Sequence, residues 1–317
     1  MKAIQFSRPG IENIEIVDRK LVGSGIKVKI TKAGLNQIDY NLIAGNVVYN
    51  VNPMPHIPGS EVTGIAMEDG KSIKKGDRVI VYNRIFDNSC EMCLSGNEHL
   101  CYNGGLWGVA TDGGYSEYIS IGEENLFKVP DSIDDNTAVS TGIGALTAYH
   151  AIKMAGSSMG KKILIYGAGN TGIFTVQLAK YMGLDVYLYS SNKMLDSLKI
   201  NILQEIPDNF KADIIINPLG GDIFGKSLSH LKRKGTIATY GVLTGRTAQI
   251  DIANIYTNEL KLVGSTGGTR NDLFELLNIL ASKKFMLPVY REFSLWDLPA
   301  ALNAFKERKN GRIILNL

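Results

Sequence analysis

Three cysteines lie within twelve residues of one another, in the pattern Cys90-x2-Cys93-x7-Cys101. Two thiols separated by two residues, with a third close by, have the spacing of a zinc-binding knuckle. A structural zinc takes four ligands in a tetrahedron, and a carboxylate oxygen is an acceptable fourth ligand. Asp87 is our first choice for it, and Glu98 is the alternative. We therefore predict one structural Zn²⁺ here; the other interpretation is three buried thiols in a lobe that has lost its metal.

A glycine-rich turn is the second pattern with chemical meaning. The motif Gly-x-Gly-x-x-Gly fills residues 167–172, directly after the apolar run 163–166 and before a helix-forming segment. In a dinucleotide-binding fold the first glycine makes the tight turn, the second lets the backbone approach a pyrophosphate, and the third allows close packing of helix on strand. Free N–H groups at the helix N-terminus then face the phosphates. The expected cofactor contacts are Gly167, Gly169, Asn170, Thr171 and Gly172.

The strand expected after this turn, Val186 to Tyr189, ends without an acidic residue. A carboxylate there, about 20 residues after the turn, would bind the ribose 2′-hydroxyl of NAD. Ser190, Ser191 and Lys193 stand there instead, and hydroxyl and ammonium groups can hold a 2′-phosphate. These residues predict a preference for NADP(H). The alternative is that Lys193 is a solvated residue and that either cofactor binds.

The elements that must position these residues differ between the parts of the chain. Up to about residue 130 the pattern predicts short strands broken by glycine, such as Ile26–Ile30. After that it predicts strand, helix and strand in quick succession, which is a βαβ unit. We predict an α/β protein with a Rossmann doubly wound parallel sheet in residues 131–265. The other domain is β-rich and is formed by residues 1–130 and 266–317.

Length and composition exclude several functional classes. The chain has 317 residues, 44% of them hydrophobic, and a net charge of only +3, which argues against nucleic acid or an anionic membrane as partner. No apolar run approaches the roughly 20 residues that a membrane span needs. The chain starts directly in a strand-like segment, so no signal peptide is visible. Clustered cysteines favour a reducing compartment. We expect a cytoplasmic protein that acts on a small molecule.

Motifs along essentially the whole chain resemble those of the medium-chain dehydrogenase/reductase family, which includes zinc alcohol dehydrogenases and quinone oxidoreductases. Besides the cysteine lobe and the glycine turn, they are Ala33-Gly34-Leu35-Asn36-Gln37-Ile38-Asp39, Pro58-Gly59-Ser60-Glu61, Gly76-Asp77-Arg78-Val79, Asp112-Gly113-Gly114-Tyr115-Ser116-Glu117-Tyr118 and Gly311-Arg312-Ile313-Ile314-Leu315. The resemblance implies a GroES-like β-rich catalytic domain beside the Rossmann domain, with substrate in the cleft between them. It also implies a homodimer or homotetramer.

The departures from the zinc alcohol dehydrogenases concern the catalytic metal. Asn36 and Ser60 stand where those enzymes have a cysteine and a histidine ligand, and Ile143 lies near the place of the third. Amide and hydroxyl groups are poor zinc ligands, and an alkyl side chain is none. Ile38 also replaces the hydroxyl residue that would relay a proton, although Glu61 is retained. We therefore predict that the catalytic zinc is absent. For Asn36 and Ser60 the alternative is local hydrogen bonding in turns.

The pattern Gly-Leu-Asn-x-x-Asp is more similar to the zinc-free quinone and enoyl reductases. Tyr49 stands where enoyl reductases of the family keep a tyrosine, which could donate a proton. Asn36 could hold the substrate oxygen, and His56 titrates near neutral pH. For each of these residues the alternative is a packing role or a place at the rim. The candidate catalytic residues are Tyr49, Asn36, Ser60 and His56.

The same resemblance adds cofactor contacts in the second half of the chain. Gly241 and Val242 follow a predicted strand, and Ser265 follows the next; in this family such backbone borders the nicotinamide amide. Arg312 matches a position whose arginine can reach the pyrophosphate, and the alternative is a surface salt bridge. The stretch from Lys193 to Ile214 is shorter than usual, so one strand–helix unit of the Rossmann half is a candidate for trimming.

Together these features predict an NADPH-dependent oxidoreductase that transfers hydride to a quinone, an enone or a related conjugated carbonyl without catalytic zinc. One alternative is an alcohol dehydrogenase or carbonyl reductase of the same family. Another is a family member that binds NADPH and catalyses little. The residues do not identify the physiological substrate or the direction of the reaction.

Overall fold

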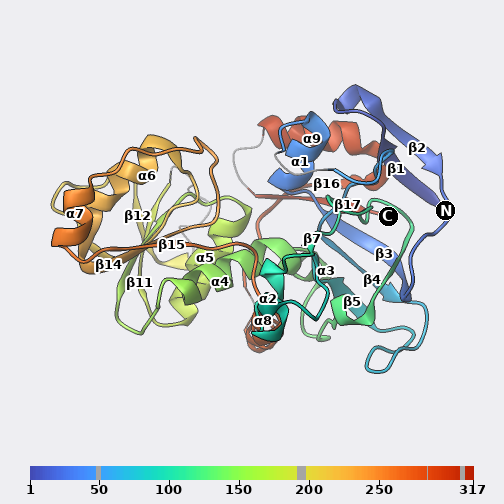
Figure 1. Ribbon diagram of the computed structural model, residues 1–317, viewed down its shortest axis with the longest axis horizontal. Coiled ribbons are helices and arrows are strands. Elements are labelled where there is room, and N and C mark those ends of the chain that lie inside the picture. Colours follow the sequence, from blue (N-terminus) through green and yellow to red (C-terminus); the bar gives the residue numbers. More distant parts are fainter. Residues whose placement is uncertain (48–50, 191–197, 284, 308–310) are drawn as a thin grey trace. The chain divides into compact units, whose positions relative to one another are not determined.

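The computed structural model describes residues 1–47, 51–190, 198–283, 285–307 and 311–317 (Figure 1). Its internal contacts divide the chain into two compact units. Unit 1 comprises residues 1–143 and 269–317, and unit 2 comprises residues 144–268. Among the described residues, no helix is both long enough and apolar enough to cross a membrane.

Unit 1 is built around a seven-stranded sheet in the order β16-β17-β3-β4-β5-β9, with β8 paired to β3. β16 and β17 are parallel, and the other neighbours are antiparallel. The strands of unit 1, in this sheet and outside it, are β1 (Lys2–Phe6), β2 (Ile14–Asp18), β3 (Ile26–Gly34), β4 (Val62–Ala66), β5 (Arg78–Val81), β6 (Arg84–Ile85), β7 (Gly105–Leu106), β8 (Tyr118–Ile121), β9 (Leu126–Lys128), β16 (Val289–Ser294) and β17 (Arg312–Asn316). Its helices are α1 (Gln37–Ala44), α2 (Glu91–Leu94), α3 (Asp135–Val139), α8 (Arg270–Ser282) and α9 (Leu298–Glu307).

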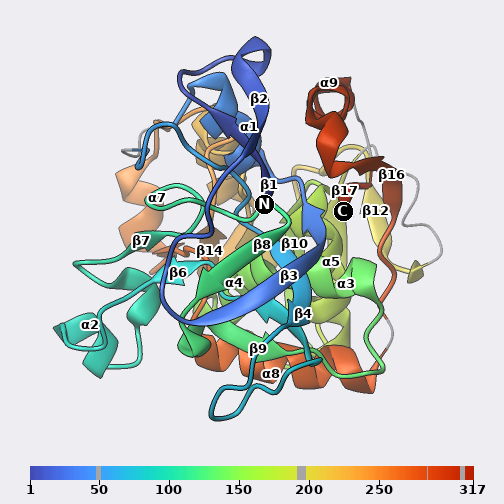
Figure 2. The same ribbon diagram turned by 90° about the vertical axis from the view of Figure 1, so that its right-hand side faces the viewer.

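The core of unit 1 follows from two periodicities in the sequence. In β3, Ile26, Val28 and Ile30 alternate with more exposed residues, because successive side chains of a strand point to opposite faces. In α9 the buried residues Leu298, Ala301, Leu302 and Phe305 recur at helical spacing and form one apolar stripe. This stripe belongs to the same core cluster as β3, and α9 packs against β16 and β17 (Figure 2).

Unit 2 contains a six-stranded parallel sheet in the order β12-β11-β10-β13-β14-β15. Its strands are β10 (Lys162–Tyr166), β11 (Asp185–Tyr189), β12 (Asn201–Leu203), β13 (Ala212–Ile216), β14 (Leu231–Thr239) and β15 (Lys261–Gly264). Its helices are α4 (Leu146–Met154), α5 (Asn170–Tyr181), α6 (Gly221–Ser227) and α7 (Ile252–Thr257). In chain order the strands run 3-2-1-4-5-6, which is the Rossmann arrangement and confirms the predicted fold class.

Two details differ from the expectations. The sequence-based domain boundary lies at residue 131, whereas the compact units divide at residue 144, because α3 packs against β3 and β4 of unit 1. In the shortened stretch of the Rossmann half, the strand β12 is retained. Residues 204–211, all of them described, contain no helix, so the shortening removes the helix that would follow β12.

Candidate functional site

The glycine turn of unit 2 has the geometry of a phosphate-binding loop. Gly167 has φ +84°, a conformation that L side chains rarely adopt. A Cβ at Gly169 would meet nothing within 4 Å, so the space beside this backbone is open. A Cβ at Gly172 would overlap the Gly167 carbonyl oxygen. The twelve-residue helix α5 starts here with no side-chain cap, and a helix N-terminus is a favourable place for an anion.

The other predicted cofactor contacts of unit 2 lie after the carboxyl ends of three strands of its parallel sheet, where open α/β sheets bind their ligands. Ser190 follows β11, Gly241 and Val242 follow β14, and Ser265 follows β15. The Ser265 N–H donates to the Thr239 carbonyl at 2.8 Å. Its buried hydroxyl has no hydrogen-bond partner among the described residues, so it is available to a ligand. Ser191 and Lys193 lie outside the described residues.

The cysteine lobe of unit 1 brings its predicted ligands together. The Sγ atom of Cys90 lies 3.6 Å from that of Cys93 and 3.7 Å from that of Cys101. These distances match the edge of a zinc tetrahedron, which is about 3.8 Å for a Zn–S bond of roughly 2.3 Å. The ligand atoms of Asp87 and the three cysteines all lie within 4.8 Å of one another. This donor set fits a structural zinc ion.

Glu98, the alternative fourth ligand, is directed elsewhere. Its Oε1 accepts hydrogen bonds from the Tyr82 hydroxyl at 3.4 Å and from the Arg270 backbone N–H. Arg270 is the first residue of α8, so this buried carboxylate lies at a helix N-terminus, where negative charge is favoured. The geometry therefore favours Asp87 as the fourth ligand.

A second polar cluster of unit 1 contains the positions compared with the catalytic zinc ligands. The Asn36 amide donates from Nδ2 to Glu61 Oε2 at 2.8 Å and accepts on Oδ1 from Arg312 Nη1 at 3.0 Å. Arg312 Nη2 donates to the same Glu61 oxygen. The Ile143 backbone N–H donates to Glu61 Oε1 at 2.5 Å. Asn36, Ile143 and Arg312 thus meet around one carboxylate.

Asp39 holds the backbone of two residues of this cluster, a role that the sequence motifs did not lead us to predict. Its carboxylate accepts the backbone N–H groups of Asn36 at 3.0 Å and Ser60 at 2.9 Å. Asn36 is the N-cap of α1 and Asp39 its third residue, so the pair forms a capping box. That spacing in the sequence was the available signal. Burial raises the pKa of Asp39 to about 6, against the lowering effect of the two backbone hydrogen bonds.

The Ser60 hydroxyl is the polar group of this cluster that makes no hydrogen bond within the described part of the chain. It is fully buried and has no hydrogen-bond partner of good geometry among the described residues. It nevertheless lies close enough to the Asp39 carboxylate to oppose the rise of that group's pKa. A hydroxyl in this state can accept or donate a hydrogen bond to a ligand.

The cluster does not fit a catalytic zinc ion. Its side chains present an amide, a hydroxyl and an alkyl group where three good ligands are needed. The Glu61 carboxylate, which a metal would need, is already held by the Arg312 guanidinium and the Asn36 amide. Arg312 is fully buried, so it does not form the surface salt bridge considered as an alternative.

Of the remaining catalytic candidates, His56 is not part of this cluster. His56 is fully buried, its Nε2 lies 3.0 Å from the Gly108 carbonyl, and its ring packs edge-on against Phe6. Burial lowers the pKa of His56, so the ring is neutral at neutral pH. These contacts describe a packed structural histidine. Tyr49 lies outside the described residues.

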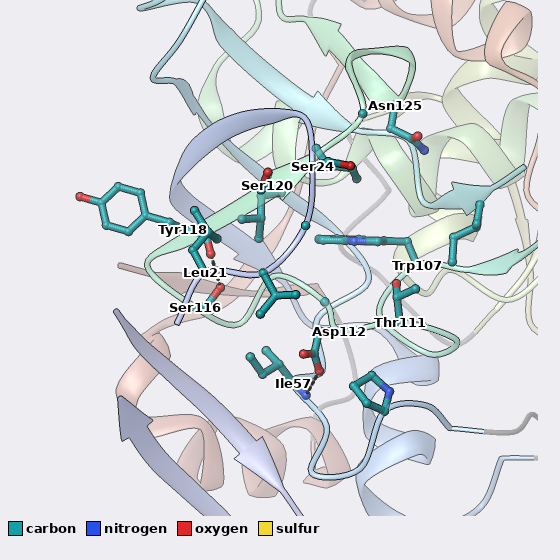
Figure 3. A pocket seen from close by; sticks show the side chains of 18 of the residues that line it. Leu21, Ser24, Ile57, Trp107, Thr111, Asp112, Ser116, Tyr118, Ser120 and Asn125 are labelled. Atoms are coloured by element: carbon teal, nitrogen blue, oxygen red, sulfur yellow. Dashed lines mark hydrogen bonds between the residues drawn. The ribbon is translucent and has the colours of Figure 1, made fainter. Parts of the chain in front are cut away.

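A separate cavity of about 570 Å³ opens in unit 1 and is lined by Leu21, Ile57, Trp107, Asp112 and Ser120, among others (Figure 3). Asp112 accepts the Ile57 N–H at 2.8 Å and pairs with Arg19 at 3.2 Å, so its carboxylate is occupied. None of the polar cluster's residues lines this cavity within the described ranges.

Comparison with known proteins supports the architecture. The model of the alcohol dehydrogenase GroES-like domain matches residues 24–131, and that of the zinc-binding dehydrogenase matches residues 171–282. An alcohol dehydrogenase from Geobacillus stearothermophilus is 31% identical over 98% of this chain and 96% of its own. The structure of a thermostable alcohol dehydrogenase from Pyrobaculum aerophilum is 32% identical, with a TM-score of 0.92 over 100% of this chain and 99% of that chain. A cobalt- and zinc-bound structure from the same organism has the same identity and coverage and a TM-score of 0.91.

This chain therefore belongs to the medium-chain dehydrogenase/reductase family, as the sequence motifs predicted. It is an NAD(P)-dependent oxidoreductase with a GroES-like domain in unit 1 and a Rossmann domain in unit 2.

Proposed function

We propose that this chain is an NADPH-dependent reductase of quinones, enones or related conjugated carbonyls that works without catalytic zinc. The observation that carries the proposal is the polar cluster itself, because Asn36, Ser60 and Ile143 offer no zinc donor set. Without a Lewis acid on the carbonyl oxygen, substrates that already accept hydride at an activated double bond or a quinone ring are favoured. The bound nicotinamide supplies the hydride.

In this proposal the protein orients the substrate and stabilises negative charge on its oxygen. Ser60 is the candidate donor from the polar cluster, and Tyr49 is the candidate outside the described residues. Gly167, Gly169 and Gly172 would cradle the pyrophosphate, and Ser190 with the following residues would favour NADP(H). Asp87 and the three cysteines would hold one structural zinc away from the chemistry. We place the enzyme in the cytoplasm as a homodimer or homotetramer.

The second candidate is an alcohol dehydrogenase or carbonyl reductase. The names of the Geobacillus and Pyrobaculum relatives favour it, since both are alcohol dehydrogenases. The two candidates differ in their products. Cyclohexenone reduced at its double bond gives cyclohexanone, whereas reduction of its carbonyl gives cyclohexenol.

The test is NADPH oxidation by the purified chain with cyclohexenone, p-benzoquinone and cyclohexanone, followed by product analysis. We expect turnover of the first two, cyclohexanone as the product of the first, and little turnover of cyclohexanone itself. Cyclohexenol as the main product would support the second candidate instead. Fluorescence titrations with NADPH and NADH test the cofactor preference, and equal affinities would contradict it.

A further inference from the structure

The cavity of unit 1 shown in Figure 3 has the size of a small-molecule site. Its volume of about 570 Å³ lies within the range of roughly 300–1,000 Å³ that is usual for such sites. Most of its wall comes from residues 20–24, 110–113 and 118–122, which are distant in the sequence. The residues of the polar cluster and of the glycine turn are not part of the wall that the described ranges form.

Two glycines hold the loop of residues 20–24 against β8. Gly23 has φ +119° and Gly25 has φ +140°, conformations that L side chains rarely adopt. A Cβ at Gly25 would overlap the Ile121 carbonyl oxygen, and one at Gly23 would lie 2.8 Å from the Ser120 carbonyl oxygen. The loop therefore approaches β8 more closely than side chains at these positions would allow. This part of the cavity wall is held in place by backbone packing.

Trp107 gives the cavity an aromatic surface. The residue is only 7% exposed, yet it lines the cavity. Figure 3 shows its indole edge-on in the middle of the view, with Asn125 on one side and Thr111 on the other. Its indole N–H donates no hydrogen bond to any residue that the structure describes. A buried tryptophan N–H usually has a partner, so a ligand with an acceptor atom would supply what the chain does not.

Asn125 adds an acceptor to the same cavity. Its Nδ2 donates to the Tyr82 carbonyl at 2.9 Å and to the Arg84 carbonyl at 2.7 Å. Both amide hydrogens are therefore used, and the orientation of the amide is fixed. Its Oδ1 accepts no hydrogen bond within the described ranges. The wall thus offers one donor, on Trp107, and one acceptor, on Asn125, beside apolar surface.

The charged groups of the wall are either paired or at its exposed edge. The Asp112 carboxylate pairs with Arg19 at 3.2 Å, and the N-terminal amino group donates to the Arg19 carbonyl at 3.0 Å. Lys20 and Glu124 are exposed, so they stay hydrated, and their charges are opposite. An ion would lose its hydration here without gaining a strong partner. The wall therefore favours an uncharged ligand.

We infer that this cavity is a second ligand site of the chain, which binds a small, uncharged aromatic alcohol of the phenol class. The aromatic ring packs against the Trp107 indole, in the manner of aromatic pairs in proteins. A phenolic hydroxyl both donates and accepts, so it can bond to the Trp107 N–H or to Asn125 Oδ1. The inference does not rest on the proposed function, because it uses no residue of the polar cluster or of the glycine turn.

The test uses 2-naphthol as the probe and the intact, zinc-loaded chain labelled with 5-fluorotryptophan. The chain has two tryptophans, Trp107 and Trp296, and Trp296 does not line the cavity. A Trp296→Phe chain assigns the two fluorine resonances. We expect 2-naphthol to shift the Trp107 resonance saturably and to leave the Trp296 resonance in place. Naphthalene, which lacks the hydroxyl, should bind about fivefold more weakly, the usual effect of one lost hydrogen bond.

Two exposed serines provide a matched pair of variants. Ser24 lines the cavity, whereas Ser7 does not. We expect Ser24→Phe to lower the affinity for 2-naphthol at least tenfold, because the added ring takes up space in the cavity. Ser7→Phe should keep the native affinity, and both variants should keep the native Tm, since neither change touches the core.

Each result decides the inference. A probe that shifts neither resonance, or both equally, would overturn it, as would native affinity in Ser24→Phe. The affinity of Ser60→Ala for 2-naphthol should equal that of the native chain. A matching loss of affinity in Ser60→Ala would locate the probe at the polar cluster and would also overturn the inference. Failure of the proposed function is a separate result, because none of these measurements requires turnover.

Discussion

At the scale of single residues, Ser60 differs from the other polar residues of the cluster, because they make hydrogen bonds in the described structure and its hydroxyl does not. The Asn36 amide donates a hydrogen bond to Glu61 and accepts one from Arg312. The Asp39 carboxylate accepts hydrogen bonds from two backbone N–H groups. The Ser60 hydroxyl is buried without a partner of good geometry among the described residues. A substrate oxygen that enters this cluster would therefore find Ser60 rather than Asn36 ready to donate.

We expect Ser60→Ala to lower kcat by about 100-fold, the usual cost of removing one donor to a developing oxyanion. Its Tm should change little, because the lost hydroxyl makes no hydrogen bond in the described structure. Steady-state NADPH oxidation and thermal melts measure the two effects. Ser116→Ala is the matched control, since that buried hydroxyl donates to the Tyr118 carbonyl at 2.9 Å; it should lower Tm and spare kcat. A native rate in Ser60→Ala would exclude the donor role.

Asp39 makes the stability of the chain depend on pH. Its pKa in the folded chain is about 6 against an ordinary value of 3.8, so the folded chain holds a proton that the unfolded chain releases. The stabilisation from that proton is complete below the ordinary pKa and is lost as the pH rises to the folded pKa. We expect the native chain to lose up to about 3 kcal/mol relative to Asp39→Asn between these two pKa values. Urea unfolding of both chains across that window measures it, and parallel pH profiles would contradict it.

At the scale of elements, the cysteine lobe and helix α8 are joined by one carboxylate. The lobe comprises α2 and the residues around it, from Asp87 to Cys101. Glu98 lies within this segment, and its side chain reaches the first N–H of α8 rather than the cysteines. The Arg270 guanidinium also lies 5.5 Å from the ring of Phe86, the residue just before the lobe, which adds a cation–π contact beside it. The lobe is therefore both a candidate metal-binding segment and an anchor for α8.

Two variants separate these roles. Cys93→Ser should lose the zinc, because it replaces a thiolate of the tetrahedral donor set by a poor ligand. Glu98→Gln should keep the zinc and lower Tm, because it removes the charge at the N-terminus of α8. Zinc per chain measured by mass spectrometry, together with Tm, checks both. Loss of zinc in Glu98→Gln would identify Glu98 as a ligand and would contradict our assignment of Asp87.

At the scale of the whole molecule, the candidate sites are divided between the two units. Unit 2 presents the glycine turn and the strand ends that suit a dinucleotide, and unit 1 presents the polar cluster and the cysteine lobe. The proposed hydride transfer would use the cofactor site of unit 2 and the substrate site of unit 1. Both relatives match nearly the whole chain, so the similarity to them extends over both units.

The sequence by itself determined what depends on local pattern. Apolar runs and helical spacing defined the elements, the glycine turn defined the dinucleotide fold, and the cysteine spacing indicated a metal lobe, because each of these signals lies within a few dozen residues. The family followed from motifs along the chain. The expected catalytic roles of Asn36, Ser60 and His56 stay predictions.

Only the tertiary structure decided which distant residues meet. That Arg312 lies against Asn36 and Glu61 depends on the pairing of β17 with β3, and no local pattern encodes that pairing. The structure likewise distinguished the two candidate ligands Asp87 and Glu98, which are almost equally close to the cysteines in sequence. Asp87 lies with the cysteines, whereas Glu98 contacts the N-terminus of α8. The burial of Asp39, which sets its pKa, also arises only when strands, loops and helix close around it, because desolvation is a property of the packed chain.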